Sequence, residues 1–252
     1  MSSPLMQAAT IKEINELVAL YTPRRTEFAK LAKRVETDLI EHADLRPLIH
    51  STKQREKDPT HLFDKLKRKA QEAIDAGKSF AITKDNLFST VGDLAGVRLL
   101  HIHTEQLAKI HPTIVKILKF HKYRYREKPL VYIWDVERQH FLKELGLKVI
   151  VRPNMYTSVH YIVEPHWGKI ACEIQVRTLA EELWGEVSHT VNYPHKTDSI
   201  ACNEQLSALA RVASGCTRLV DSIFASETEH KARSLSKGRS GGTGRVPKGT
   251  SS

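Results

Sequence analysis

Apolar residues recur every three or four positions in several segments of the chain, a spacing typical of helices packed on a core. In the first segment, Ile11, Ile14 and Leu17 share one helical face. Pro23 and Pro59 suit helix starts, because the first turn needs no hydrogen bond from the residue that proline replaces. The predicted helices span residues 8–21, 22–42, 58–77, 105–120, 178–193 (ended by Pro194) and 198–224.

A period of two residues, typical of strands, replaces the helical period in the middle of the chain. It predicts strands over residues 96–102, 158–164 and 169–178. In the last strand, the apolar row is Ile170, Cys172, Ile174 and Val176, and the opposite row is Ala171, Glu173, Gln175 and Arg177. We expect the first row on a core and the second on a sheet surface. Residues 123–147 are interpreted as an edge strand with a mobile excursion.

Helices before and after a group of strands predict an α+β fold. The 252 residues are 40% hydrophobic and 27% charged, which is typical of globular proteins. No apolar run approaches the ~18 residues of a membrane-spanning helix. Three cysteines without CxxC spacing and the lack of a secretory signal pattern favour a cytoplasmic protein.

The formal net charge of +10 predicts an anionic partner, either nucleotide phosphates or a nucleic acid. Part of this charge lies in residues 225–252, where six Lys and Arg stand against two Glu. This basic tail is rich in Gly, Ser and Thr, and we expect it to be disordered.

Two acidic residues are candidate ligands of Mg²⁺, which prefers one or two carboxylates together with phosphate oxygens. Asp93 precedes a predicted strand, and Glu173 lies within one. Their alternative roles are a turn-capping aspartate and a surface salt-bridge ladder. A dense basic group around one helix start suits a triphosphate or is merely a solvated face: Arg55, Lys57, Lys65, Lys67, Arg68 and Lys69.

Tyr156 and His160 frame a turn that leads into a strand. A tyrosine at the rim of a cleft can stack on a nucleobase, a contact worth about 1–3 kcal/mol in single-strand nucleic-acid sites. Its alternative role is ordinary packing at a sheet edge.

Four motifs in order resemble the synthetase domain of the RelA/SpoT family. They are Arg55-x-Lys57 followed by Lys65, Asp93-Leu-Ala-Gly-Val-Arg98, Asn154-x-Tyr156-x-Ser158-Val-His160 and Glu173-x-Gln175-x-Arg177-Thr178. The family transfers the pyrophosphate of ATP to the 3′-hydroxyl of GDP or GTP, giving ppGpp and pppGpp. The resemblance implies a nucleotidyltransferase-like mixed sheet flanked by helices. It places helices at 1–49, the synthetase domain at 50–194, a C-terminal helix at 195–224 and the tail at 225–252.

The resemblance also implies a role for each matched residue. Arg55 and Arg98 would sandwich the adenine of ATP, and Lys57 and Lys65 would contact its phosphates. The implied metal ligands are Asp93 and Glu173, with Mg²⁺ as the cofactor. The implied catalytic residues are Asp93, Glu173 and Gln175: Glu173 would assist the metal or activate the acceptor hydroxyl, and Gln175 matches the amide next to it. The acceptor-side residues would be Asn154, Tyr156 and His160.

The chain departs from the family pattern at two positions. Met155-Tyr156-Thr157-Ser158 replaces the common Gly-Tyr-Arg-Ser, so an acceptor-side arginine is missing, and His61 replaces a common serine. The acceptor alternatives are the 3′ end of tRNA, as in toxic relatives, and adenine nucleotides. A different alternative is a catalytically idle nucleotide-binding or scaffold protein. Small relatives often form tetramers through terminal helices, so one interpretation of the helix at 198–224 is a homo-oligomer contact; the other, more common for an amphipathic helix, is packing on the core of this chain.

Overall fold

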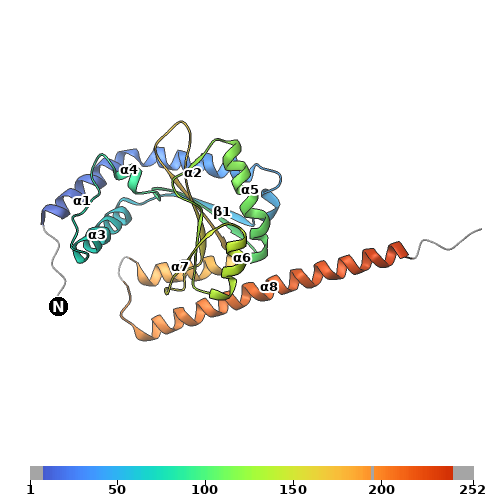
Figure 1. The fold of residues 1–252 in the computed structure, drawn as a ribbon. Helices are drawn as coiled ribbons and strands as arrows, with labels where there is room; N and C mark the ends of the chain where they lie inside the picture. The colour runs from blue at the N-terminus through green and yellow to red at the C-terminus, as the bar shows by residue number, and fades with distance from the viewer. Residues whose placement is uncertain (1–7, 194–195, 241–252) are drawn as a thin grey trace, which may run out of the picture.

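The computed structural model describes residues 8–193 and 196–240 and is organised around a mixed β-sheet (Figure 1). Within these residues the sheet has seven strands, and its order is β1-β2-β7-β6-β4-β5, with β3 also pairing with β6. The β2–β7 and β4–β5 pairs are parallel and the other pairs are antiparallel. The strands are β1 Ser51–Glu56, β2 Ala95–His101, β3 Arg124–Tyr125, β4 Leu130–Ile133, β5 Lys148–Val151, β6 Ser158–Glu164 and β7 Cys172–Thr178.

Helices flank this sheet, which confirms the predicted α+β class. They are α1 Ala8–Tyr21, α2 Arg25–Ile40, α3 Pro59–Asp75, α4 Leu87–Thr90, α5 Leu107–Phe120, α6 Gln139–Glu144, α7 Leu179–Asn192 and α8 Ile200–Ser240. Short 3-10 turns occur at Thr22–Arg24, Arg46–Leu48, Thr104–Gln106 and Val136–Arg138. No helix in the described part of the chain is long and apolar enough to cross a membrane.

The apolar face of the sheet packs against α2. Leu99 of β2 pairs with Thr52 of β1 and with Val176 of β7, so the three side chains share a face. On that face the Thr52 hydroxyl donates a hydrogen bond to the Glu36 carboxylate of α2 at 2.5 Å. Val176 and its row neighbours Cys172 and Ile174 are at most 1% exposed. The apolar row predicted for this strand is therefore confirmed as core.

Helix α7 lies over the opposite face of the sheet. Its start is fixed by a capping box in which the Thr178 hydroxyl accepts from the Glu181 amide and the Glu181 carboxylate accepts from the Thr178 amide. Because α7 and the loop before β6 cover this face, Glu173, Gln175 and Arg177 are buried. We predicted that this row lies on a surface of the sheet. The row does lie on that face, but it is buried and not exposed to solvent.

Strands β1 and β5 were not predicted, and the region interpreted as one edge strand holds two strands, β3 and β4. Strand β1 has the sequence STKQRE, which shows no apolar alternation, and β5 has only four residues. Strand β4 is not at an edge, because it lies between β6 and β5. The expected excursion after it contains a 3-10 turn and α6. Strands β4 and β5 have only four residues each, which is too few to show a period of two along the sequence.

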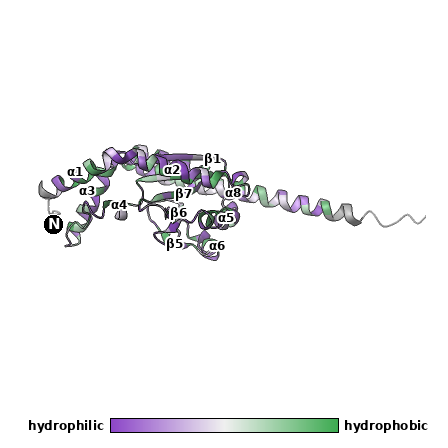
Figure 2. Ribbon diagram, turned by 90° about the horizontal axis from the view of Figure 1, so that it is seen from above, coloured by the Kyte–Doolittle hydropathy of each residue, from purple (hydrophilic) through white to green (hydrophobic). Residues whose placement is uncertain are grey.

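Helix α8 is longer than the predicted helix over 198–224. It continues to Ser240, so the expectation of a disordered tail is wrong for residues 225–240, and residues 241–252 lie outside the described part. The extension carries Glu227–Lys231 and Glu229–Arg233 ion pairs at i,i+4. Ion pairs in which Glu is nearer the N-terminus than its cation stabilise a helix even where the helix has no tertiary contacts. Figure 1 shows this part projecting beyond the sheet, and Figure 2 shows it as a mixture of hydrophilic and hydrophobic segments.

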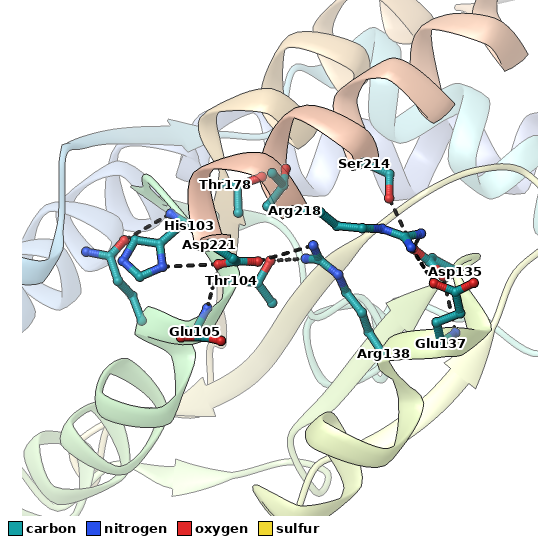
Figure 3. A network of polar contacts seen from close by, with 12 residues as sticks. His103, Thr104, Glu105, Asp135, Glu137, Arg138, Thr178, Ser214, Arg218 and Asp221 are labelled. Atoms are coloured by element: carbon teal, nitrogen blue, oxygen red, sulfur yellow. Dashed lines mark hydrogen bonds and ion pairs between the residues drawn. The ribbon is translucent and has the colours of Figure 1, made fainter. Parts of the chain in front are cut away.

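A polar network fastens α8 to the rest of the domain (Figure 3). Asp221 accepts hydrogen bonds from the Glu105 amide at 3.2 Å and from Arg138 Nη2 at 3.2 Å, and its Oδ1 lies 3.1 Å from His103 Nδ1. One turn away, Arg218 forms ion pairs with Asp135 and Glu137. The helix is therefore held to the turns that precede α5 and α6.

Replacing Asp221 by alanine is expected to destabilise the protein. The change leaves the Arg138 guanidinium, whose side chain is 16% exposed, with one acceptor fewer, which costs about 1–3 kcal/mol. The free energy of unfolding in urea measures the effect. Glu229→Ala, which breaks an exposed pair on the same helix, should change it by less than about 0.5 kcal/mol. Equal effects of the two changes would contradict the role given to Asp221.

Candidate active site

The strand register places the predicted site residues in two rows across the face under α7. Lys53 of β1 pairs with Arg98 of β2, Arg98 with Gln175 of β7, and Gln175 with His160 of β6. The adjacent row runs Arg55, Gly96, Glu173 and Ile162 over the same four strands. Since paired residues share a face, five of the ten predicted site residues meet here: Arg55, Arg98, His160, Glu173 and Gln175.

Two glycines shape the site. A Cβ on Gly96 would lie 3.3 Å from Arg55 Cγ, so the bare backbone of Gly96 leaves the Arg55 side chain room over β2. A Cβ on Gly92 would lie 2.9 Å from Ile162 Cγ2, a distance that no ordinary contact allows. Gly92 therefore lets the Asp93 turn approach β6 next to Glu173, since Ile162 is paired with Glu173.

Asp93 is held between two lysines. Lys57, just after β1, places Nζ 2.9 Å from Oδ2, and Lys65 of α3 places Nζ 2.7 Å from Oδ1. Burial acts to raise the pKa of Asp93, but the two ammonium groups outweigh it and hold that pKa well below its usual range. Burial lowers the pKa of Lys57, and its pairing with Asp93 partly offsets this. Asp93 is therefore a buried anion with the ammonium groups of Lys57 and Lys65 beside it.

Glu173 is held by two neighbours on the sheet. Its Oε1 lies 2.8 Å from His160 Nδ1, and its Oε2 accepts a hydrogen bond of 2.7 Å from Gln175 Nε2. Burial and the charge of Asp93 act to raise the pKa of Glu173, but the His160 contact prevails and keeps it lowered. The influence of Asp93 shows that the two carboxylates lie within electrostatic reach of each other.

These two acids are the candidate metal ligands. The described residues contain no group of three or more His, Cys, Asp or Glu side chains arranged to hold a metal ion. Two nearby carboxylates nevertheless fit a magnesium ion, because this ion takes few protein ligands and completes its shell with water and phosphate oxygens. Each carboxylate offers about four lone-pair positions, so the contacts with Lys57, Lys65, His160 and Gln175 leave acceptor capacity.

Tyr156 lies in a loop at the other end of the row. Its hydroxyl meets His160 Nε2 at 3.1 Å and accepts a hydrogen bond from Arg177 Nη2, while the Arg177 guanidinium lies 4.8 Å from its ring centre. The ring of Tyr132 lies 6.0 Å away. These hydrogen bonds fix the direction of the Tyr156 side chain. Its ring also packs against the apolar cluster around Trp184, so packing is part of its role.

The residue before Tyr156 has a strained backbone. Met155 has φ 59°, a left-handed conformation that costs about 1 kcal/mol or more for a residue other than glycine. Its side chain packs against a small apolar cluster made by Trp184 of α7 with Ala210 and Ala213 of α8. The methionine that replaces the family's common glycine therefore anchors the loop to these two helices. Asn154, next to it, is exposed.

Several residues near the site were not predicted from the sequence. Arg98 forms ion pairs with Glu182 at 2.5 Å and Glu186 at 2.6 Å, both from α7. Between α3 and the end of α7, the rings of His61 and Tyr193 lie 4.5 Å apart, and those of His189 and Tyr193 stack at 4.7 Å. Acidic residues on a capped helix usually face solvent, so no signal in the sequence singled out Glu182.

The structure does not gather the whole basic group of α3 at Asp93. Lys65 reaches it, whereas Lys67 and Arg68 are exposed and Arg68 lies 3.7 Å from Glu72 one turn along the same helix. Since α3 presents one side to the site, only residues on that side can contact a ligand there.

Comparisons with known proteins identify the family of this chain. The family model described as "Region found in RelA / SpoT proteins" matches residues 54–198. GTP pyrophosphokinase YwaC of Bacillus subtilis (strain 168) is 26% identical over 156 residues, covering 60% of this chain and 61% of that protein. The chain thus matches about three fifths of that curated relative.

Solved structures share the fold. A GTP pyrophosphokinase family protein from Streptococcus pneumoniae superposes with a TM-score of 0.58 at 20% identity, covering 90% of this chain and 98% of that one. The small alarmone synthetase 1 from Bacillus subtilis bound to its product pppGpp gives 0.51 at 21% identity, covering 86% and 99%.

Replacing Tyr156 by phenylalanine is expected to destabilise the site. The change removes one of the three acceptors of the buried Arg177 guanidinium and a partner of His160, at a cost of about 1–3 kcal/mol in the free energy of unfolding. Chemical denaturation measures it. Tyr132→Phe is the matched control, since the structure gives the Tyr132 hydroxyl no hydrogen bond to any described residue. If both variants unfold like the unmodified protein, the Tyr156 hydroxyl does not hold the site together.

Proposed function

Because the chain belongs to the RelA/SpoT family, we propose that it is a magnesium-dependent enzyme that transfers the β,γ-pyrophosphate of ATP to the 3′-hydroxyl of GDP or GTP. One observation carries this proposal: the strand register sets Arg55, Arg98, Glu173 and His160 side by side in that order from β1 to β6. Asp93 lies in the turn before β2, and Tyr156 lies in the loop before β6, where its hydroxyl meets His160. This is the order in which a donor base, a polyphosphate and an acceptor nucleoside would lie.

The donor ATP would bind at the β1–β2 side of the site. Arg55 and Arg98 lie on one face of neighbouring strands in diagonal positions, which are about 7–8 Å apart between Cα atoms. Two planar guanidinium groups at such a separation suit the two faces of an adenine ring. Lys57 and Lys65, which converge on Asp93, would contact the triphosphate.

Asp93 and Glu173 would hold the magnesium ion. When bound, Mg²⁺ supplies positive charge against the triphosphate oxygens. The lysines add charge from the α3 side, so negative charge that develops on the leaving group meets preorganised cations.

Glu173 would act as the general base. In the transfer, the acceptor 3′-oxygen bonds to the β-phosphorus, the bond between that phosphorus and the oxygen of the α-phosphate breaks, and AMP leaves. The proton of the 3′-hydroxyl passes to Glu173. The hydrogen bond from Gln175 and the contact with His160 hold the carboxylate in place, and its lowered pKa keeps it ionised at neutral pH.

The acceptor nucleotide would bind beside Tyr156, with Asn154 and His160. Thr157 follows Tyr156 and carries no charge, so the loop lacks a guanidinium at this position. This residue and the net charge of +10 favour tRNA as the second candidate acceptor.

An acceptor assay tests the proposed function. Protein incubated with Mg²⁺ and ATP labelled at the γ-phosphate should transfer label to GDP and GTP. Parallel reactions with ATP as acceptor and with bulk tRNA separate the alternatives, and omission of Mg²⁺ should abolish transfer. Label on tRNA alone would replace the proposed acceptor. Absence of transfer to every acceptor would favour a nucleotide-binding protein without activity.

Glu173→Gln is expected to reduce turnover about 100-fold or more, because the amide cannot accept the proton of the acceptor hydroxyl. Binding of a non-hydrolysable ATP analogue, measured by calorimetry, should remain close to that of the unmodified protein. Glu144→Gln on the exposed side of α6 is the control and should leave turnover unchanged. A nearly active Glu173→Gln variant would remove Glu173 from the proposed mechanism.

A further inference from the structure

The carboxylate of Glu182 is shared by cations from three strands. Glu182 lies in the first turn of α7 and is 6% exposed. Its Oε1 accepts hydrogen bonds from Arg98 Nη1 at 2.5 Å and from Lys53 Nζ at 3.2 Å. Its Oε2 accepts from Arg177 Nη1 at 3.3 Å. One buried carboxylate therefore joins β1, β2 and β7 from above the sheet.

The contacts of Glu182 lead to both nucleotide positions. On one side is Arg98, which would stack on the donor adenine. On the other side Arg177 donates from Nη2 to Gln175 Oε1 at 2.8 Å and to the Tyr156 hydroxyl. The guanidinium of Arg177 also lies over the Tyr156 ring. A continuous set of hydrogen bonds thus runs from the donor side through Glu182 to the tyrosine on the acceptor side.

Burial makes this arrangement sensitive to change. Hydrogen bonds and ion pairs strengthen where water is excluded, and a buried charge that loses one partner depends more on those that remain. The side chains of Arg177 and Glu182 are 6% and 8% exposed, so solvent does not replace a lost contact. If Arg98 moves to bind an adenine, its hydrogen bond to Glu182 changes. The hydrogen bond between Glu182 and Arg177 then changes in strength as well.

We propose that Glu182 is a positioning residue that couples the donor nucleotide site to the acceptor nucleotide site. This inference rests on the proposed function, because it takes Arg98 and Tyr156 as contacts of the two nucleotides. Coupling of this kind is reciprocal: each nucleotide raises the affinity for the other by the same factor.

Glu186 provides a matched control on the same helix. Its Oε1 contacts Arg98 Nη1 at 2.6 Å and Lys53 Nζ at 3.6 Å, whereas the structure gives it no contact with Arg177 among the described residues. Its side chain is 54% exposed. Loss of the Glu186 charge should therefore alter donor binding without altering the link to Tyr156.

Calorimetry with Mg²⁺ and α,β-methylene ATP, in which the bond to be broken is blocked, tests the inference without turnover. The affinity for the analogue is measured alone and with saturating GDP, and the affinity for GDP is measured in the reverse order. The unmodified protein should show a coupling factor of about fivefold or more. Glu182→Gln should reduce it to about one, while Glu186→Gln should weaken analogue binding and retain the factor.

Three results would overturn the inference: a factor of one in the unmodified protein, an unchanged factor in Glu182→Gln, or equal loss of the factor in both variants. A merely structural role would lower the melting temperature of Glu182→Gln and leave the factor intact. If that variant does not fold, Glu182→Asp, which keeps the charge and withdraws it by one methylene, replaces it with the same outcomes. Failure of the unmodified protein to bind either nucleotide would instead refute the proposed function.

Discussion

The site depends on the parallel pairing of β2 with β7. This pairing sets Gly96 beside Glu173 and Arg98 beside Gln175, and the antiparallel neighbours on each side add Arg55 and His160 to the same face. A shift of one residue would move every polar side chain of β7 to the face that packs on α2. The register is fixed because Ile174 and Val176, in alternate positions, are buried in the core. Hydrophobic burial of one face of the sheet thus determines which polar side chains lie on the other face.

The polar face remains folded because its buried charges have partners of opposite sign. Asp93 lies between Lys57 and Lys65, and Glu182 lies between Arg98 and Arg177. Removing one charge from such a set destabilises the folded protein by more than the ion pair stabilises it, because the remaining partner becomes a buried, unpaired charge. The net charge of +10 does not reveal this balance, because several of the excess cations lie on the exposed side of α3 and along α8.

Ordered motifs in the sequence named most of the residues that the structure brings together on this face of the sheet, while local patterns predicted only part of the fold. The alternation around Glu173 identified both faces of β7, and the helix starts at Pro59 and Thr178 were placed correctly. The strand that carries Arg55 was missed because polar residues fill it and its pairing with β2 is a long-range contact. Burial of the Glu173 row was missed for a related reason: the helix that covers it follows β7 in the chain, and sequence alternation contains no information on what packs above a sheet.

The strained Met155 connects the loop that carries Tyr156 to helices α7 and α8. A left-handed methionine persists only where its surroundings hold it, and here its partly buried side chain packs against Trp184, Ala210 and Ala213. Trp184 is itself tied to α8 by a hydrogen bond from Nε1 to the Leu206 carbonyl at 2.9 Å. Helix α8 is in turn fastened by Arg218 and Asp221 to the turns before α6 and α5. The direction of Tyr156 therefore has two supports, Arg177 from the sheet below it and α8 through Met155. A helix outside the sheet thereby supports the loop for which we propose acceptor binding.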